Sequence, residues 1–270
     1  MADIPTILQR ILDTKQEELA NRSGQRDLAT IRSMAADQPE ARGFADRVIT
    51  FSAAGTAVIA EVKKASPSAG IIREDFNPAE IAQSYQQAGA ACLSVLTDEQ
   101  YFKGDDDYLA QARNACALPV LRKDFMVDAW QIYESRVLGA DCVLLIVAAL
   151  SRDQLQELDG VARETGLDVL VEVHDEKEVE DALTTGARLV GVNNRDLRTF
   201  TTDLETTERL QPLVTESRTL VTESGIHTVD DVARMRAAGI HSFLVGEAFM
   251  RAPDPGAVLR ELFFEEAEIE

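Results

Sequence analysis

The decapeptide Ile-Ala-Glu-Val-Lys-Lys-Ala-Ser-Pro-Ser, residues 59–68, begins as a run of small and apolar residues, which predicts a buried strand. Glu61 and Lys63 stand two residues apart in it, so both side chains leave the same face of the strand. Ser66-Pro67 predicts the end of the strand and the start of a loop. Opposite charges at a buried strand end are costly unless they are paired or functional, and this stretch alone favours a structural ion pair and a functional site equally.

Seven further apolar runs follow, and segments with helix start and stop signals separate them. Asn77-Pro78 and Ser151 are typical helix starts, and further cap candidates are Asp128, Asp175, Thr228 and Asp254. Glycine precedes every second strand, at positions 89, 139, 186 and 239, and is expected to end a helix there in the left-handed conformation. The eight predicted strands are 57–62, 92–96, 118–121, 142–147, 169–173, 189–192, 219–222 and 243–245.

Eight strands that alternate with helices predict the α/β class, with a parallel sheet covered by helices. In a chain of 270 residues this number favours a (β/α)8 barrel, the TIM barrel, which we assign to residues 53–270. A doubly wound open sheet is the alternative, but it usually has fewer strands, and its Gly-x-Gly-x-x-Gly phosphate loop is absent after the first strand. Residues 1–52 are expected to form a helical extension, in which 6–20 has the spacing of an amphipathic helix.

Composition narrows the range of partners. The formal net charge of −20 makes nucleic acid and anionic membrane surfaces poor partners for the molecule as a whole. The sequence has no apolar signal-peptide segment at its start and no run long enough to span a bilayer. Three cysteines without a Cys-x-x-Cys pair are typical of a reducing cytoplasm, and three widely spaced histidines argue against a histidine-based metal site.

Polar side chains stand at the carboxyl ends of the predicted strands, where (β/α)8 barrels carry their chemistry. Closure of the barrel should bring two lysines and three glutamates into one pocket, where they shift each other's pKa values as general acids and bases require. The structural alternative for Glu172 is an ion pair with Lys63, and His174 is interpreted as the start of a loop. In strand order the polar residues are Glu61, Lys63, Asp98, Lys123, Glu172, Asn193, Glu223, Ser224 and Glu247.

Small residues follow the last two predicted strands, namely Ser224-Gly225 and Gly246. Backbone N–H groups can approach an anion closely beside such residues, and this position is the usual phosphate site of the barrel. The sequence therefore predicts a phosphorylated small-molecule substrate.

Longer motifs at these strand ends resemble the indole-3-glycerol phosphate synthase family of tryptophan biosynthesis, over nearly the whole chain. The most specific motif is Glu-Val-Lys-Lys-Ala-Ser-Pro-Ser at 61–68, which fits the family signature throughout. The N-terminal amphipathic segment is similar to the extra helix of the family, which lies over the barrel mouth. Other matching stretches are 94–102, 121–125, 171–174, 191–197 and 223–226.

The resemblance implies a carboxy-lyase that converts 1-(2-carboxyphenylamino)-1-deoxyribulose 5-phosphate to indole-3-glycerol phosphate by ring closure, decarboxylation and dehydration, without a metal or cofactor. Lys123 would be the general acid at the ribulose carbonyl, and Glu172 the general base in dehydration. Lys63 would hold the substrate carboxylate, Glu61 would orient Lys63 and contact the sugar hydroxyls, and Asn193 would hydrogen-bond the substrate. The division of acid duties between the two lysines stays open.

The resemblance also implies a set of binding residues. Phe125 should form an apolar wall for the aromatic ring. Glu247 stands where some members of the family carry serine, so its carboxylate should point away from the phosphate, toward solvent or a basic partner. The residues implied in binding the phosphate and the rest of the substrate are Ser66, Lys64, Arg195, Glu223, Ser224, Gly225, Gly246 and Glu247.

Two other functions fit parts of this pattern. A Schiff-base aldolase needs a desolvated lysine, which such barrels commonly place on strand six, where this chain has Asn193. A barrel that only binds phosphorylated metabolites would need no acid–base set, whereas Lys63, Lys123 and Glu172 are all present. We expect a cytoplasmic monomer or weak homo-oligomer that binds neither nucleic acid nor membranes.

Overall fold

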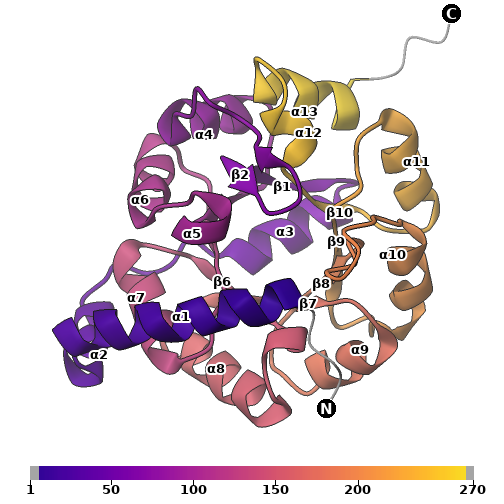
Figure 1. Cartoon of the computed structure of the whole chain (residues 1–270). Coiled ribbons are helices and arrows are strands. Elements are labelled where there is room, and N and C mark those ends of the chain that lie inside the picture. Colours follow the sequence, from indigo (N-terminus) through magenta and orange to yellow (C-terminus); the bar gives the residue numbers. More distant parts are fainter. Residues whose placement is uncertain (1–5, 266–270) are drawn as a thin grey trace, which may run out of the picture.

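The computed structural model describes residues 6–265, and eight parallel strands form a closed barrel in it (Figure 1). The first strand pairs with the last, so the sheet has no open edge. The predicted TIM barrel is therefore confirmed, and the open-sheet alternative is excluded. In chain order the barrel strands are β1 (Ala57–Val62), β4 (Cys92–Leu96), β5 (Val120–Lys123), β6 (Cys142–Ile146), β7 (Asp168–Val173), β8 (Leu189–Asn193), β9 (Thr219–Glu223) and β10 (Ser242–Val245).

Three strands differ from their predicted bounds in a way that affects the site. The third barrel strand, β5, begins at Val120 after Pro119, which has no N–H to contribute to the ladder, and it continues through Lys123. Strands β8 and β9 likewise run one residue further than predicted, through Asn193 and Glu223, which pair with each other. Because backbone pairing does not depend on side-chain polarity, the ladder continues into the polar residues of the mouth.

Helices surround the barrel, and six of them begin at the cap residues predicted from the sequence. Asn77, Asp128, Ser151, Asp175, Thr228 and Asp254 all cap the helix that follows. The outer helices are α4 (Pro78–Gln87), α5 (Glu99–Phe102), α6 (Asp106–Ala115), α7 (Ala129–Leu138), α8 (Arg152–Glu164), α9 (Glu176–Ala182), α10 (Glu205–Leu210), α11 (Val229–Ala237), α12 (Glu247–Met250) and α13 (Pro255–Phe263), with short 3-10 turns at Val147–Ala149 and Gln211–Leu213.

The glycine predictions hold at three of four helix ends. Gly89, Gly139 and Gly239 have positive φ values of 94°, 91° and 80°. The prediction for Gly186 is wrong, because α9 already ends at Ala182 and Gly186 lies in the following loop without a left-handed φ. An isolated glycine before a strand thus marks a helix end only when the helix reaches it.

The barrel interior is apolar beneath the charged residues of the mouth, toward the amino-terminal ends of the strands. Ile59, Leu121, Leu170 and Val221 are buried inside it and come from alternate strands, as expected for the layered interior of this fold. Each lies two residues before a charged residue of the mouth, because alternate residues of a strand share a face. The apolar layer therefore supports a charged layer directly above it.

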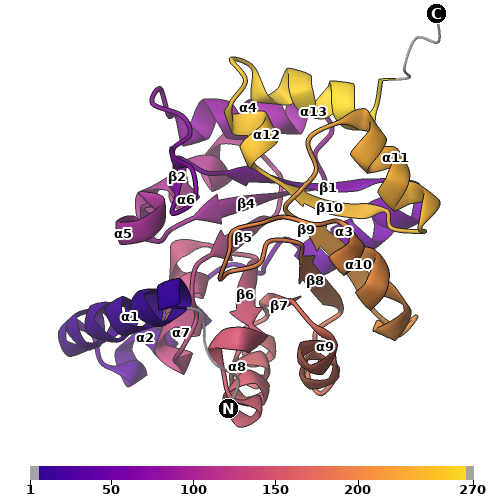
Figure 2. The same cartoon turned by 45° about the vertical axis from the view of Figure 1, so that its right-hand side comes forward.

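The N-terminal extension reaches both ends of the barrel (Figure 2). Helix α1 (Thr6–Gln25) lies at the mouth, whereas α3 (Phe44–Ala53) packs Phe44 and Val48 against the opposite, amino-terminal end of the strands. The short helix α2 (Leu28–Ala36) connects them and packs on α7. The expectation of a helix over the mouth is confirmed for α1, which runs beyond the predicted 20 to Gln25. A domain boundary at 52/53, within the last turn of α3, stays a prediction.

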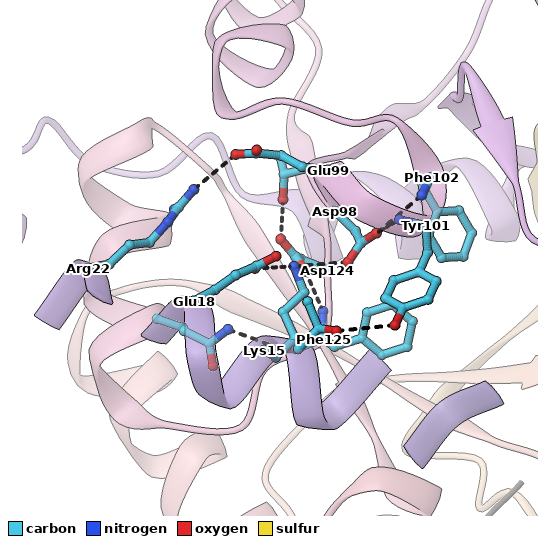
Figure 3. A network of polar contacts seen from close by, with 12 residues as sticks. Lys15, Glu18, Arg22, Asp98, Glu99, Tyr101, Phe102, Asp124 and Phe125 are labelled. Carbon is cyan, nitrogen blue, oxygen red and sulfur yellow. Dashed lines mark hydrogen bonds and ion pairs between the residues drawn. The ribbon is translucent and has the colours of Figure 1, made fainter. Parts of the chain in front are cut away.

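A buried ion cluster holds α1 in place (Figure 3). The Lys15 side chain is only 3% exposed, and its Nζ lies 2.9 Å from Asp98 Oδ2, 3.0 Å from Asp124 Oδ1 and 2.8 Å from Glu18 Oε2. Burial opposes the charge of Lys15, but Asp124 and Asp98 outweigh this effect and raise its pKa. Asp98 also caps α5, and Asp124 directly follows Lys123. The cluster thus connects the helix over the mouth to two strand ends.

Replacement of Lys15 tests this anchor. Lys15→Met should lower the free energy of unfolding by about 3–5 kcal/mol, because it leaves Asp98 and Asp124 buried without their cation. Urea unfolding followed by circular dichroism measures the change. The control is Arg32→Gln, which breaks an exposed ion pair with Glu164 and should cost less than about 1 kcal/mol. A Lys15 variant no less stable than this control would contradict the anchoring role.

Candidate active site

A pocket opens at the carboxyl ends of the barrel strands, beneath α1. Thirteen of the fourteen residues predicted from the sequence line it, and the exception is Lys64. The predicted residues that line the pocket are Glu61, Lys63, Ser66, Lys123, Phe125, Glu172, Asn193, Arg195, Glu223, Ser224, Gly225, Gly246 and Glu247. Residues separated by up to about 190 positions in sequence therefore meet at one site.

Lys123 lies at the centre of the charged groups. Its Nζ is 3.0 Å from Glu172 Oε2 and 3.1 Å from Glu223 Oε2, so one ammonium bridges two buried carboxylates. Glu172 pairs with Lys123 and not with Lys63, so the structural alternative for Glu172, an ion pair with Lys63, is wrong. Two carboxylates around one lysine form a group that can donate and accept protons within a single pocket.

Burial and charge shift the pKa values of all three groups. Burial opposes the charge of Lys123, but Glu172 and Glu223 outweigh it and raise the pKa. Burial likewise opposes ionisation of Glu172, yet Lys123 and then His174 lower its pKa below the ordinary value. Burial raises the pKa of Glu223 to about 7, where the attraction of Lys123 is countered by Glu172 and Glu61. At neutral pH Lys123 is therefore charged, and Glu172 is more fully ionised than Glu223.

Glu61 and Lys63 form the predicted ion pair, with 2.6 Å between Lys63 Nζ and Glu61 Oε2. Gly246 provides the space for this pair, because a Cβ atom at that position would lie 2.3 Å from Glu61 Oε2. From the sequence, Gly246 is predicted to be small so that a phosphate can approach the backbone closely. The structure shows that it also accommodates a carboxylate of the pocket.

Asn193 is held in one orientation by its neighbours. Its Nδ2 donates to Glu172 Oε1 at 3.2 Å, and its Oδ1 accepts from Ser224 Oγ at 3.0 Å and from the backbone N–H of Arg195 at 3.0 Å. The adjacent Asn194 points the other way and ties the backbone carbonyls of Glu223 and Ser224 to β8. The loops after β8 and β9 are therefore joined beside Glu172.

Sequence reasoning missed the function of Gly191, in the middle of β8. A Cβ atom there would lie 2.0 Å from Glu223 Oε1, so the missing side chain leaves the space that the Glu223 carboxylate occupies. The signal was present, because a glycine within an otherwise apolar strand marks the close approach of another group. The approaching group could not be predicted from the sequence, because Glu223 belongs to the next strand and comes close only when the barrel forms.

The loop after β9 begins with two residues in the left-handed backbone conformation. Ser224 and Gly225 both adopt positive φ, at 64° and 89°, which costs energy for the serine. The Glu247 carboxylate lies 2.7 Å from Arg251 Nη2 and 3.4 Å from Arg195 Nη2, so the predicted basic partner is present. Burial opposes ionisation of Glu247, but Arg251 outweighs it and lowers the pKa. Phosphate binding at these loops stays a prediction.

The other side of the pocket is apolar. Phe125 lines it, with its ring centroid 6.1 Å from that of Phe102, and Leu8 and Ile11 of α1 close it from above. Ile146 completes this wall from β6. One pocket therefore offers an apolar surface beside a set of acids and bases, as an aromatic substrate with ionic groups would require.

Residues 6–265 contain no group of three or more His, Cys, Asp or Glu side chains that is arranged to hold a metal ion. Among the helices of the same range, none is both long enough and apolar enough to cross a membrane.

A sequence profile of the indole-3-glycerol phosphate synthase family matches residues 8–262. The chain is also 57% identical, over 259 residues, to indole-3-glycerol phosphate synthase of Laribacter hongkongensis (strain HLHK9), and the match spans 95% of this chain and 98% of that protein. The chain belongs to the indole-3-glycerol phosphate synthase family. The resemblance seen in the strand-end motifs is thereby confirmed.

Similar folds occur in solved structures of low sequence identity. KGPDC from Streptococcus mutans superposes with a TM-score of 0.60 at 11% identity, covering 77% of this chain and 95% of that one. The alpha subunit of tryptophan synthase from Legionella pneumophila str. Paris gives 0.60 at 14% identity, covering 83% and 97%. These likenesses support the barrel fold of this indole-3-glycerol phosphate synthase family member and carry no argument about its chemistry.

Gly191 allows a direct test of the site geometry. Gly191→Ala should lower kcat by about 10²-fold, because the new Cβ displaces the Glu223 carboxylate and with it Lys123. The fluorescence of the indole product measures the rate. Gly160→Ala is the matched control: no atom lies within 4 Å of its Cβ position, and alanine suits α8 better than glycine. Equal rates for the two variants would refute the proposed packing around Glu223.

Proposed function

We propose that this pocket catalyses the reaction of the family, the conversion of 1-(2-carboxyphenylamino)-1-deoxyribulose 5-phosphate to indole-3-glycerol phosphate. Family membership makes the chain a carboxy-lyase of tryptophan biosynthesis. The observation that carries the assignment of residues is the Lys123 ammonium, which bridges Glu172 and Glu223 beside the Glu61–Lys63 pair. No described feature favours a Schiff-base aldolase, since Asn193 stands on the sixth barrel strand.

Ring closure needs an acid at the ribulose carbonyl. The ring carbon that bears the carboxylate attacks this carbonyl, and negative charge develops on its oxygen. Lys123 is charged at neutral pH and lies in a buried site, where a hydrogen bond to developing charge is strong. Lys123 donates its proton to that oxygen. Phe125 and the apolar wall hold the aromatic ring in the plane from which attack occurs.

Decarboxylation and dehydration follow at the same carbons. Lys63 holds the substrate carboxylate until carbon dioxide leaves, and Glu61 keeps the Lys63 ammonium at the pocket wall. Glu172 is ionised and fixed by Asn193, so it can remove the proton that must leave before water is expelled. Lys63 or Lys123 then protonates the departing hydroxyl. All groups needed for the three steps lie around one pocket.

The phosphate would lie between the loops after β9 and β10. Backbone N–H groups of Gly225, Gly246 and Glu247 would hold it, with help from the Ser224 and Ser66 hydroxyls. Arg195 lines the pocket and would supply positive charge for the phosphate, although its guanidinium also pairs with Glu247. Lys64 lies outside the lining residues, so its part in phosphate binding is the weakest of the proposed assignments.

The remaining partners are argued from composition. With a net charge of −20, the protein would take its anionic substrate through this local positive site and would avoid nucleic acid. Cys92, Cys116 and Cys142 are free thiols, which fits a reducing cytoplasm. A monomer or weak homo-oligomer remains our proposal for the state of assembly.

Lys123→Ala tests the acid of ring closure. The variant should lose several orders of magnitude in kcat, because it lacks the proton donor proposed for the carbonyl, while the affinity for a product analogue should stay within about tenfold. Indole fluorescence measures turnover, and calorimetry measures binding. The control is Lys177→Ala, which removes an exposed lysine on α9. Turnover near that of the parent in Lys123→Ala would overturn the assignment.

Metal independence follows from the proposed proton donors. Activity should survive exhaustive chelation, because Lys123 and Lys63 supply the positive charge that a Lewis acid would otherwise provide. The rate is measured before and after treatment with a chelator, and again after each divalent ion is added. Loss of activity on chelation, followed by recovery with one ion, would show that this expectation is wrong.

A further inference from the structure

Two carboxylates compete for the charge of Lys123, and the chemistry needs one of them as a base. Glu172 and Glu223 both reach the same ammonium within 3.1 Å and belong to alternate strands, β7 and β9. Groups so close do not ionise independently. If both carboxyl groups kept a proton, the pocket would have no carboxylate base. If both lost it, the pocket would have no neutral carboxyl group. Something in their surroundings must distinguish them.

The Glu223 side is poor in partners. Glu223 Oε2 contacts Lys123, but Oε1 is buried and has no hydrogen-bond partner. That oxygen lies against Gly191, which has no side chain that could donate a hydrogen bond to it. A carboxyl group with one unpaired buried oxygen is better accommodated with a proton than as an anion.

The Glu172 side has a second cation within reach. His174 follows Glu172 on the same face of the chain, and its Nε2 lies 3.5 Å from Glu172 Oε1. That nitrogen is buried and makes no hydrogen bond to any other group. The same Glu172 oxygen accepts from Asn193 Nδ2 at 3.2 Å. Glu172 is thus surrounded by donors on the side away from Lys123.

The imidazole of His174 is fixed by α9. Glu178 Oε2 accepts from the backbone N–H of His174 at 2.7 Å and lies 3.0 Å from its Nδ1. Burial opposes the charge of His174, but the hydrogen bond to Glu178 and the field of Glu172 outweigh it and raise its pKa. The ring is therefore held between two carboxylates, one inside the barrel and one on a helix. The loop start expected at His174 is present, but its side chain faces inward.

We propose that His174 is a positioning residue that keeps Glu172 ionised, so that the proton shared by the two carboxylates resides on Glu223. The proposal rests on the proposed function of Glu172 as the base of dehydration. His174 is not among the residues that line the pocket, and it acts through Glu172, which is. It supplies the asymmetry that Lys123, which lies equally close to both carboxylates, cannot provide.

The pH dependence follows from the charges that face these groups. Glu172, Glu178 and, further away, Glu223 face His174, whereas Lys123, His174 and Asn193 face Glu172. A neighbouring cation lowers the pKa of a carboxyl group, so removal of the His174 charge should raise the pKa of Glu172. His174 is charged below its own raised pKa, which includes the acidic range where Glu172 takes up its proton. As the pH is lowered, activity should therefore be lost at a higher pH when His174 is replaced than in the parent.

The test compares the pH profiles of kcat, from pH 3.5 to 9, for the parent and two substitutions of His174. In His174→Gln the acidic limb should move up by about one pH unit, so that activity along this limb, below the pKa of Glu172, falls by about tenfold while activity at pH 8.5 changes little. His174→Lys restores a cation at this position and should return the limb toward the parent. Glu178→Gln releases the imidazole and should shift the limb in the same direction as His174→Gln, but less.

A direct readout does not depend on turnover. Carboxyl signals of protein labelled with ¹³C at glutamate Cδ, assigned by their loss in Glu172→Gln and Glu223→Gln, should titrate at separate pH values in the parent. In His174→Gln the Glu172 signal should titrate at higher pH and approach that of Glu223. The control is His241→Gln, which changes a half-buried histidine bonded to the Gly55 carbonyl and should shift neither signal.

The outcomes separate this inference from the proposed function. Unchanged Glu172 titration and an unchanged acidic limb in His174→Gln would overturn the role of His174, even if Glu172→Gln is inactive. Parent-like turnover in Glu172→Gln would instead overturn the role of Glu172 as base, whatever the carboxyl titrations show. A limb that shifts equally in His174→Gln and His174→Lys would show that shape rather than charge matters, and would also refute the inference.

Discussion

Lys123 can remain charged inside the barrel only because carboxylates from other strands reach it. Glu61, Lys123, Glu172 and Glu223 come from β1, β5, β7 and β9, which are alternate strands of the closed sheet. Alternate strands contribute to the same layer of a (β/α)8 interior, so these four residues form one charged layer. The layer beneath it is apolar and buried. Burial makes each charge costly alone, and the layer is stable because its members compensate each other.

The gaps in this layer matter as much as its side chains. The Glu61 carboxylate lies against Gly246, which directly follows β10, and the Glu223 carboxylate lies against Gly191 of β8. A methyl group at either position would meet a carboxylate oxygen at 2.3 Å or less. Close packing of the interior leaves no alternative place for these groups. The chemistry of the pocket therefore depends on residues that have no side chain at all.

The N-terminal extension is joined to the same strand end that carries the central lysine. At the end of β5 the side chains alternate: Arg122 points outward to Glu134 of α7, Lys123 points into the pocket, and Asp124 accepts the charge of Lys15 from α1. Helix α1 in turn closes the pocket with Leu8 and Ile11. Residues 122–124 thus connect three features: they stabilise the barrel mouth, they hold the helix α1 that covers the pocket, and they position the Lys123 ammonium.

The sequence alone determined the local elements and the chemical types at the strand ends. The eight apolar runs and the pairing of Glu61 with Lys63 follow from the two-residue period of a strand. The helix caps follow from side chains that accept hydrogen bonds from the backbone N–H groups of the next few residues. The family motifs then named thirteen of the residues that line the pocket. Such features could be predicted because neighbours along the chain decide them.

Only the tertiary structure decided which distant groups touch. Glu172 and Glu223 lie 49 and 100 residues from Lys123, and their contact depends on how far each strand is staggered when the barrel closes. The same closure buried Lys15, gave Gly191 its function and turned His174 toward Glu172. Periodicity fixes the face from which a side chain leaves its strand, but the distance across a barrel is set by all eight strands together, and no local pattern contains it.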